Sequence, residues 1–351
     1  MIFVLWLLPL ALALTLMSIP FLMRAAPVWG LMDNPGGRKR HERETPLIGG
    51  LAIAFGLLPV LCYFVIDPVV SLSWFVGALI LLMLGVYDDL HELRPAHRFV
   101  PHLLVGITLC FADRELVTLG HLVDDTPLLL GVLALPVTLF AVAAAINAMN
   151  LVDGIDGLLG MLAVVPLSFI MFLAWHAGLS FELALSGSLL MALLAFLCFN
   201  LRFPWAPSAR IFMGDAGSTL IGFTLAWLLI SLARLNAMPP VLALYLIALP
   251  LLDTAGVIFR RYRAGLSAAT PGRDHLHHIL LDAGFTQNQT LLVLGALSLL
   301  IAGVGMLMNI LVVNEALMFL FFLLLLSIYL LISSSATIAI KRLKGWFQSV
   351  D

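Results

Sequence analysis

The repetition of long apolar runs along nearly the whole chain constrains the fold more than any other feature of the sequence. Each run has about 18 to 23 residues, the length that a helix needs to cross a hydrocarbon core of about 30 Å. Hydrophobic residues make up 62% of the chain and charged residues 11%, whereas a soluble domain has about 45–50% and 25%. A soluble fold could not bury so much apolar surface. The sequence therefore predicts an all-α integral membrane protein.

Hydropathy and helix-breaking residues divide the chain into about eleven transmembrane helices. The first run has no basic region before it and no small-residue cleavage site, so we expect it to be retained as a helix. We predict one polytopic membrane domain over residues 1–340 and a short basic cytoplasmic tail over residues 341–351. The predicted spans lie near residues 2–23, 47–66, 70–87, 98–112, 127–147, 158–177, 180–200, 211–233, 240–259, 289–312 and 316–340.

The basic residues are distributed unevenly between the two sides of this topology. Of the 18 Lys and Arg residues, 15 fall in segments that the eleven spans place on one side and Arg98 lies at a span end on that side, which leaves only Arg114 and Arg234 on the other. Basic residues near span ends are kept on the cytoplasmic side of a membrane. We therefore predict an outside N-terminus and a cytoplasmic C-terminus. The loops rich in Gly, Asn, Asp and His lie on the same side, so we expect the active site in the cytoplasmic loops.

The first of these loops combines a basic run over residues 38–43 with Thr45 and a glycine pair at residues 49–50. Basic side chains beside a membrane can act solely as topology anchors or as contacts to lipid headgroups. Exposed backbone amides at the start of the following helix would form a site for an anion. Arg40 and Thr45 are therefore candidates for binding an anionic substrate.

The second loop begins with adjacent carboxylates, Asp88 and Asp89, at the inner end of an apolar run. Charged groups at that position are costly, so we expect them to be paired, hydrated or bound to a cation. A solvated helix cap is the alternative. Because neighbouring residues on a helix point in different directions, one acid could hold a metal ion while the other meets the substrate. Glu92, one turn beyond Asp88, would share its face.

The third loop has the most specific pattern in the chain. Asn147 and Asn150 are three residues apart and so share one helix face, and Asp153 and Asp156 follow, each before a glycine. Asp-Gly turns bend the backbone and let it approach a ligand closely. Two amides and two acids at a membrane boundary serve no hydrophobic purpose. The pattern indicates a binding site for a polar substrate.

The fourth loop places Asp215 between glycines at the start of a span. Its carboxylate offers the hard oxygen that Mg²⁺ prefers, although an ordinary helix cap would also use an Asp here. Phe212, just before it, is by residue type more often part of a core than a stacking partner for a base.

The fifth loop contains Arg273 followed by a cluster of histidines at positions 275, 277 and 278. One cluster without Cys, or without a Glu at the spacing of metalloproteases, is a poor zinc signature. Hydrogen bonding to phosphate oxygens is the use that we expect for His275, His277 and His278, with Arg273 contributing its charge.

Taken together, the motifs resemble those of the polyprenyl-phosphate N-acetylhexosamine-1-phosphate transferase family, in the order of that family and over about residues 24 to 285. The His-Leu-His-His form of the last motif is similar to the branch that transfers N-acetylglucosamine 1-phosphate to undecaprenyl phosphate. Glu92 is a departure, because this branch often has Asp there. The motifs that carry the resemblance are Asp88-Asp89, Asn147-x-x-Asn150-x-x-Asp153-Gly-x-Asp156-Gly, Phe212-Met-Gly-Asp215-x-Gly-Ser218 and Arg273-Asp-His275-Leu-His277-His278.

The resemblance implies a phosphoglycosyl transferase of the bacterial inner membrane. It would move N-acetylglucosamine 1-phosphate from UDP-N-acetylglucosamine to undecaprenyl phosphate, release UMP and initiate a cell-surface polysaccharide such as the O antigen of lipopolysaccharide. Mg²⁺ would be the cofactor, with Mn²⁺ as a substitute. The implied roles are metal binding for Asp215 and Asp89, catalysis for Asp88, Asp89, Asp156 and His278, and substrate binding for Asn147, Asn150, Asp153, Phe212, Arg273, His275, His277, Arg40 and Thr45.

Several alternatives stay open at the level of sequence. The donor could be another UDP-N-acetylhexosamine, since epimers differ by a single hydroxyl group. The product could enter common-antigen or teichoic-acid synthesis, and the reaction could proceed by direct attack or through an aspartyl phosphate. A transporter of lipid-linked sugars is the main rival, but it should carry ionisable residues near the midplane, where Asp253 is the main candidate. We expect no nucleic-acid partner, and a homodimer is one option for the oligomeric state.

Overall fold

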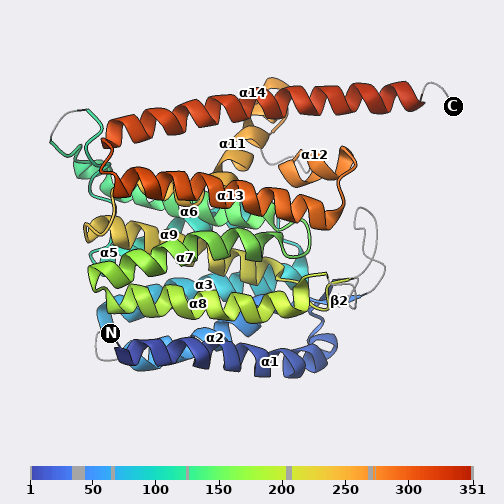
Figure 1. The fold of residues 1–351 in the computed structure, drawn as a ribbon. Coiled ribbons are helices and arrows are strands. Elements are labelled where there is room, and N and C mark those ends of the chain that lie inside the picture. Colours follow the sequence, from blue (N-terminus) through green and yellow to red (C-terminus); the bar gives the residue numbers. More distant parts are fainter. Residues whose placement is uncertain are drawn as a thin grey trace.

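The computed structural model describes residues 2–33, 44–64, 68–123, 126–202, 208–267, 272 and 274–348, and for residues 2–3, 95–96 and 335–348 it describes the main chain alone. Within this part of the chain the protein is a bundle in which most of the long helices run roughly parallel or antiparallel to one another (Figure 1). A helix suits a membrane because it satisfies its backbone hydrogen bonds within its own segment. This confirms the prediction of an all-α membrane protein.

The described elements alternate between long helices and short connections. The only paired strands of the described residues are β1 and β2, which are antiparallel and join Met32 to Pro46 and Asp33 to Thr45. The elements are η1 (Ile2–Trp6), α1 (Leu7–Trp29), β1 (Met32–Asp33), β2 (Thr45–Pro46), α2 (Gly49–Tyr63), α3 (Pro68–His91), α4 (Pro95–Leu104), α5 (Ile107–Phe111), η3 (Gly131–Leu133), α6 (Ala134–Val152), α7 (Leu158–Ala177), α8 (Ser180–Asn200), α9 (Gly214–Arg234), α10 (Pro240–Leu246), α11 (Ala248–Arg263), α12 (Leu276–Asp282), α13 (Gln287–Ile310) and α14 (Glu315–Gln348).

Each predicted span overlaps a helix, although not all of these helices have the length of a full membrane crossing. Two of the apolar helices, Gly49–Tyr63 and His97–Phe111, are shorter, and the count of eleven spans stays a prediction. The helix α14 continues to Gln348, past the predicted boundary between membrane domain and tail at residue 340. In the described residues, eight helical segments are long and apolar enough to span a membrane: Val4–Trp29, Pro68–His91, Gly131–Val152, Leu158–Ala177, Ser180–Asn200, Gly214–Arg234, Gln287–Ile310 and Glu315–Ser334.

The span predicted over residues 240–259 is not one continuous helix. It consists of α10 and α11, which meet at Ile247 with a bend of 79°. Pro250 explains the break, because in a continuous helix its ring would collide with the carbonyl of Leu246, four residues earlier. Near the start of α11 the missing N–H of Pro250 costs little.

Helix α9 forms the centre of the bundle. Every residue from Ala216 to Ala233 is buried, and the helix packs against α3 and α6. Small residues let these backbones approach closely: a Cβ on Gly222 would lie 2.7 Å from the Cα of Ile146, and one on Gly85 would collide with the backbone of Ala216. Association of membrane helices depends on such close packing between small residues. The sequence thus fixes the start of α9, and with it Asp215, tightly against α3 and α6.

The described residues that follow α3, α6 and α8 lie at the end of the bundle that holds β2 and α12, opposite the N-terminus (Figure 1). This arrangement brings together the loops that the sequence analysis singled out. Which side of the membrane this end faces stays a prediction.

Candidate active site

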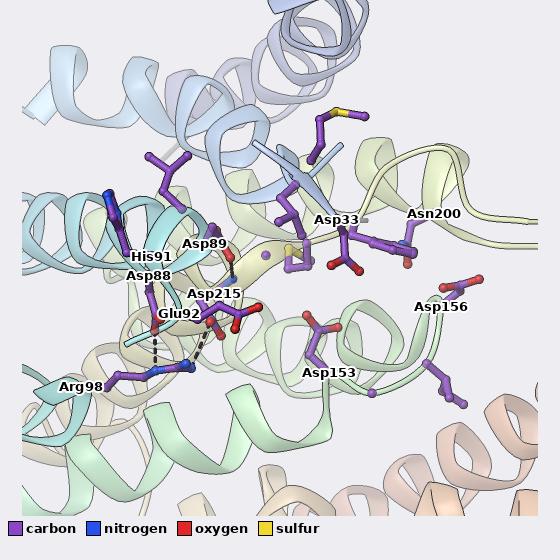
Figure 2. A pocket seen from close by; sticks show the side chains of 18 of the residues that line it. Asp33, Asp88, Asp89, His91, Glu92, Arg98, Asp153, Asp156, Asn200 and Asp215 are labelled. Carbon is purple, nitrogen blue, oxygen red and sulfur yellow. Dashed lines mark hydrogen bonds and ion pairs between the residues drawn. The ribbon is translucent and has the colours of Figure 1, made fainter. Parts of the chain in front are cut away.

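A cavity of about 950 Å³ lies where these loops meet. Figure 2 shows several of its acidic side chains around a common space, with Asp156 at one end of the view and Asp88 and Asp89 at the other. Among the described residues, two arginines, Arg98 and Arg202, contribute to the lining. The carboxylates of the lining are Asp33, Asp88, Asp89, Glu92, Asp153, Asp156 and Asp215.

Asp88 is a buried acid with a dedicated partner. Its side chain is 3% exposed, its Oδ2 lies 2.5 Å from the Nε of Arg98, and its Oδ1 accepts a hydrogen bond of 2.7 Å from the Leu93 amide. Helix α3 ends at His91, and Glu92 follows with a φ of 49°. Glu92 therefore lies beyond the helix rather than on the face of Asp88, contrary to the expectation from spacing.

Asp89 binds the amino end of α9. Its Oδ1 accepts a hydrogen bond of 2.7 Å from the amide of Asp215, and its Oδ2 accepts one of 3.3 Å from the amide of Ala216. A carboxylate is stabilised there by the unpaired amides and by the helix dipole. Gly214 has a φ of 73°, and a Cβ on it would lie 2.6 Å from Oδ2 of Asp89. Only glycine fits this turn, which sets Asp215 beside the acid pair.

Asp215 is held from two sides. Its Oδ2 accepts a hydrogen bond of 3.0 Å from Nη1 of Arg98, and its Oδ1 accepts one of 2.6 Å from Nδ2 of Asn150, which also donates to Ser218. Figure 2 shows Arg98 reaching both Asp88 and Asp215. The side chain of Asp215 is 27% exposed, and each oxygen retains a further lone pair. Asp215 can therefore accept another ligand from the cavity.

Asp153 and Asp156 reach the cavity from the turn after α6. Desolvation by the surrounding protein, followed by the negative charges of Asp215 and Asp89, raises the pKa of Asp153 from 3.8 to about 8. Asp156 is paired instead: its Oδ2 lies 2.6 Å from the Nε of Arg202. The two acids of the double Asp-Gly turn thus have opposite electrostatic surroundings.

Asn200, at the end of α8, links two of the site loops. Its Oδ1 accepts a hydrogen bond of 2.6 Å from the amide of Gly157, and its Nδ2 donates one of 2.9 Å to the carbonyl of Ile211. The side chain is buried. It therefore fixes the turn that carries Asp156 relative to the segment that carries Phe212.

The three histidines of the fifth loop have different surroundings. His278 lines the cavity, whereas His277 is buried, and a Cβ on Gly154 would collide with its ring. His275 is buried with its Nδ1 2.9 Å from Oδ2 of Asp253. The histidine cluster therefore lies between the Asp-Gly turn and α11, and the side chain of His278 lines the cavity.

The structure brings many of the predicted site residues together, but not all of them line the cavity. Thr45, Asn147, Asn150, His275 and His277 are not part of its described lining, and Arg40 and Arg273 lie outside the described residues. Asn147 donates a hydrogen bond of 2.7 Å to the carbonyl of Ala143 in its own helix. The predicted residues that line the cavity are Asp88, Asp89, Asp153, Asp156, Phe212, Asp215 and His278.

The prediction of an anion site at the start of α2 is wrong for the amides of Gly49 and Gly50. The amides of Gly49 and Gly50 donate to the carbonyls of Phe212 and Met213, at 2.9 and 3.0 Å. A Cβ on Gly50 would collide with the backbone of Gly217. The glycine pair therefore serves close packing of α2 on the fourth loop and α9, and these two amides already have acceptors. The substrate role of Thr45, which is buried in β2, stays a prediction.

Sequence reasoning missed four residues of the cavity lining, Asp33, Arg98, Asn200 and Arg202, and one residue that supports the site from outside it, Asp253. Arg98 was counted as a topology marker and Asp253 as the main ionisable residue near the midplane. A signal did exist for Asn200 and Asp253, since a polar residue inside an apolar run needs a partner in the protein. No signal in the sequence identified which loops these partners belong to.

The acidic groups suit a divalent cation that is shared with a substrate. Among the described residues no three His, Cys, Asp or Glu side chains are arranged as a closed metal site. Mg²⁺ does not require one, because it usually binds one or two carboxylates together with water and substrate phosphates. Asp215 and Asp153 fit this donor set, since Asp215 retains lone pairs and Asp153 is an exposed acid that lines the same cavity. Asp89 fits less well, because both of its oxygens face backbone amides.

Comparison with known proteins identifies relatives over most of the chain. Residues 71–233 match the model of glycosyl transferase family 4. An undecaprenyl-phosphate alpha-N-acetylglucosaminyl 1-phosphate transferase of Haemophilus influenzae is 36% identical over 317 residues, which cover 88% of this chain and 88% of that protein. The proteins of the same name from Escherichia coli K12 and Yersinia pestis are each 36% identical, over 84% and 83% of this chain and 80% and 81% of their own length.

Proposed function

Because this chain belongs to glycosyl transferase family 4 and is a phosphoglycosyl transferase, we propose that it transfers N-acetylglucosamine 1-phosphate from UDP-N-acetylglucosamine to undecaprenyl phosphate. The products would be undecaprenyl-pyrophosphoryl-N-acetylglucosamine and UMP. The names of the relatives support the acceptor and the sugar. The confirmed family resemblance supports UDP as the carrier.

The charge of the cavity is the observation that carries this proposal. Seven described carboxylates line it, against the two arginines Arg98 and Arg202 and the histidines His91 and His278. Two phosphorylated substrates would be repelled from such a surface unless a cation neutralised both. The chemistry that Mg²⁺ would supply here, held by cavity acids, is neutralisation of phosphate charge and stabilisation of the charge that develops during transfer. The excess of acids therefore supports Mg²⁺ as cofactor, with Mn²⁺ as a substitute of similar ligand preference.

The protein's own residues have positioning and electrostatic roles in this proposal. Asp215 and Asp153 would hold the cation, and Asn150 and Arg98 orient Asp215 through their hydrogen bonds. His278, on the side of the cavity formed by α12, donates to a phosphate oxygen.

No strong general base is required for the attack. If the acceptor phosphate resembles other phosphomonoesters, its second pKa is about 6, so it is mostly a dianion at pH 7. Direct attack on the sugar-bearing phosphorus then leaves the bond between sugar carbon and oxygen intact, and the anomeric configuration is retained.

The location of the cavity is consistent with a lipid acceptor. It lies at one end of a bundle of apolar helices, so the phosphate headgroup of a lipid can enter it while the hydrocarbon chain stays in the bilayer (Figure 1). We place the protein in the bacterial inner membrane with this end in the cytoplasm, where nucleotide sugars are made. The product would initiate a cell-surface polysaccharide.

The direct test is UMP release from purified protein in detergent with undecaprenyl phosphate, Mg²⁺ and a panel of UDP-N-acetylhexosamines. We expect release that requires the acceptor, is abolished by EDTA and is fastest with UDP-N-acetylglucosamine. A preference for another donor would replace the sugar in this proposal. The absence of release from every donor by folded protein would contradict the proposed reaction.

A further inference from the structure

A buried acid outside the cavity organises the histidine loop, the segment 274–278 that carries His275, His277 and His278. Asp253, on α11, is 3% exposed, and its carboxylate has three partners. Its Oδ2 lies 2.9 Å from Nδ1 of His275, and its Oδ1 accepts hydrogen bonds of 2.8 Å from the Leu276 amide and 2.9 Å from the hydroxyl of Tyr329. A buried carboxylate is costly unless it is hydrogen-bonded in this way. Asp253 therefore requires the loop and α14 to be in place together.

Helix α14 makes a second contact with the same region. Arg260, two turns after Asp253 on α11, donates from Nη1 to the hydroxyl of Ser333 at 2.8 Å and from Nη2 to the carbonyl of Asp274. Arg261 adds an ion pair of 3.0 Å from its Nε to the carboxylate of Asp274. The residue just before the histidines is thus fixed by two arginines, one of which is itself held by α14.

The surface of α11 is shaped to receive Tyr329. A Cβ on Gly256 would lie 2.7 Å from Cε1 of Tyr329 and 3.0 Å from Nη1 of Arg260. Gly256 thus provides the space in which the tyrosine ring and the guanidinium lie against α11. This packing is independent of the hydrogen bonds and places the same two groups.

The network ends at the cavity. His275 begins the turn into α12, its ring is stacked on that of His277 at 5.6 Å between centroids, and the ring of His277 lies 4.2 Å from that of His278. Of these rings, His278 lines the cavity. A displacement of His275 would therefore move the side of the cavity that His278 forms.

We infer that the last helix, α14, is a working part of the active site: Tyr329, acting through Asp253, is a positioning residue that sets the histidine loop against the cavity. Neither Tyr329 nor Asp253 is among the residues that line the cavity. Their effect on turnover rests on the proposed function, because it requires that His278 meets a phosphorylated substrate.

The test compares two tyrosines whose hydroxyls each join α14 to another helix: Tyr329, on α14, bonds to α11, and Tyr245, on α10, bonds to α14. Tyr329→Phe removes the hydroxyl that donates to Asp253, and Tyr245→Phe removes a hydroxyl that donates to the carbonyl of Met318 on α14 at 2.6 Å, away from the loop. Each variant loses one hydroxyl group that joins α14 to another helix, α11 for Tyr329→Phe and α10 for Tyr245→Phe. We expect kcat/KM for the donor to fall on the order of tenfold in Tyr329→Phe, and by less than about twofold in Tyr245→Phe. Gly256→Ala, which displaces the Tyr329 ring, should reproduce the first result.

A spectroscopic measurement makes the inference independent of turnover. A trifluoromethyl tag on a cysteine at the exposed position Ala283, at the end of α12, reports the position of the loop by fluorine NMR in a background with the native cysteines Cys62, Cys110 and Cys198 replaced by alanine. We expect Tyr329→Phe to shift or broaden the signal and Tyr245→Phe to leave it unchanged. Equal spectra and equal kinetics for the two variants would overturn the inference. If even the unmodified protein releases no UMP, the proposed function fails, and the spectra still decide whether α14 positions the loop.

Discussion

At the scale of single residues, the acids of the cavity differ in what already binds them. Asp88 has an arginine and an amide, and Asp89 has two amides at the start of α9. Asp215 has one partner on each oxygen and remains partly exposed. We therefore assign the first two acids mainly to holding the site together and Asp215, with Asp153, to the cation.

The first prediction concerns Asp215. Asp215→Asn removes a negative charge from the proposed cation site while keeping the size of the side chain, so we expect Mg²⁺-dependent UMP release to fall by more than about 100-fold. The unfolding temperature in detergent should change little. Asp113→Asn is the matched control, since Asp113 is an exposed acid at the opposite end of the bundle that pairs with Arg234. Full activity in Asp215→Asn would exclude Asp215 as an essential ligand.

The raised pKa of Asp153 leads to a prediction about stability and pH. Its pKa is about 8 in the folded protein, against 3.8 as the ordinary value for an aspartate, so between these values the folded state binds more protons than the unfolded state. The contribution of Asp153 to the free energy of unfolding therefore falls as the pH rises from about 4 to about 8. In EDTA, Asp153→Asn should unfold at a higher temperature than the parent at pH 9, and the difference should shrink toward pH 5. A constant difference across this range would contradict the assigned titration.

Arg98 is predicted to be important for stability as well as for the site. Arg98→Leu would leave the carboxylate of Asp88 buried without its charged partner, which costs about 3–5 kcal/mol. Adding Asp88→Asn should recover much of this loss. Arg234→Leu, which removes a pair with an exposed acid, should cost at most about 1 kcal/mol. Reversible unfolding in mixed micelles measures all of these variants, and similar losses for the two arginines would argue against a buried pair at Asp88.

At the scale of elements, the apolar runs predicted where helices lie, and the loop motifs predicted which connections carry the site. The sequence did not predict the 79° bend between α10 and α11, because Pro250 can end a helix or merely kink one. Nor did it predict that the glycine pair before α2 packs on α9, since close approach and anion binding both favour glycine. These outcomes depend on contacts between distant segments, which one sequence does not specify.

The glycines of the bundle allow a test of helix packing. Gly222 on α9 faces the backbone of Ile146 at 2.7 Å from an added Cβ, whereas an added Cβ on Gly303 of α13 meets no described atom within 4 Å. Gly222→Ala should therefore destabilise the protein by about 1–3 kcal/mol through overpacking. Gly303→Ala should stabilise it by up to about 1 kcal/mol, because alanine has the higher helix propensity. Unfolding in mixed micelles checks both signs, and a stable Gly222→Ala variant would refute the close approach of α9 and α6.

At the scale of the whole molecule, the site lies at one end of the bundle, and the charge bias of the sequence predicts that this end faces the cytoplasm. Ser267, in the loop after α11, is exposed at this end. In a background without the native cysteines, Ser267→Cys should react with a membrane-impermeant thiol reagent in inverted vesicles and be protected in intact cells. Labelling in intact cells would show that the protein has the opposite orientation. The donor would then have to be supplied from the other side of the membrane.

The burial of α9 also has a consequence for how the protein is made. This helix is enclosed by segments that precede it in the chain, such as α3 and α6, and it also contacts the later α10. During synthesis α3 and α6 enter the bilayer before α9, which later packs between them. Until α9 is inserted, the small-residue faces of these two helices are exposed to lipid. Because Asp215 is the second residue of α9, a nascent chain has no complete acidic centre until α9 has inserted. The acidic centre therefore forms only after the helices from α1 to α8 have been synthesised.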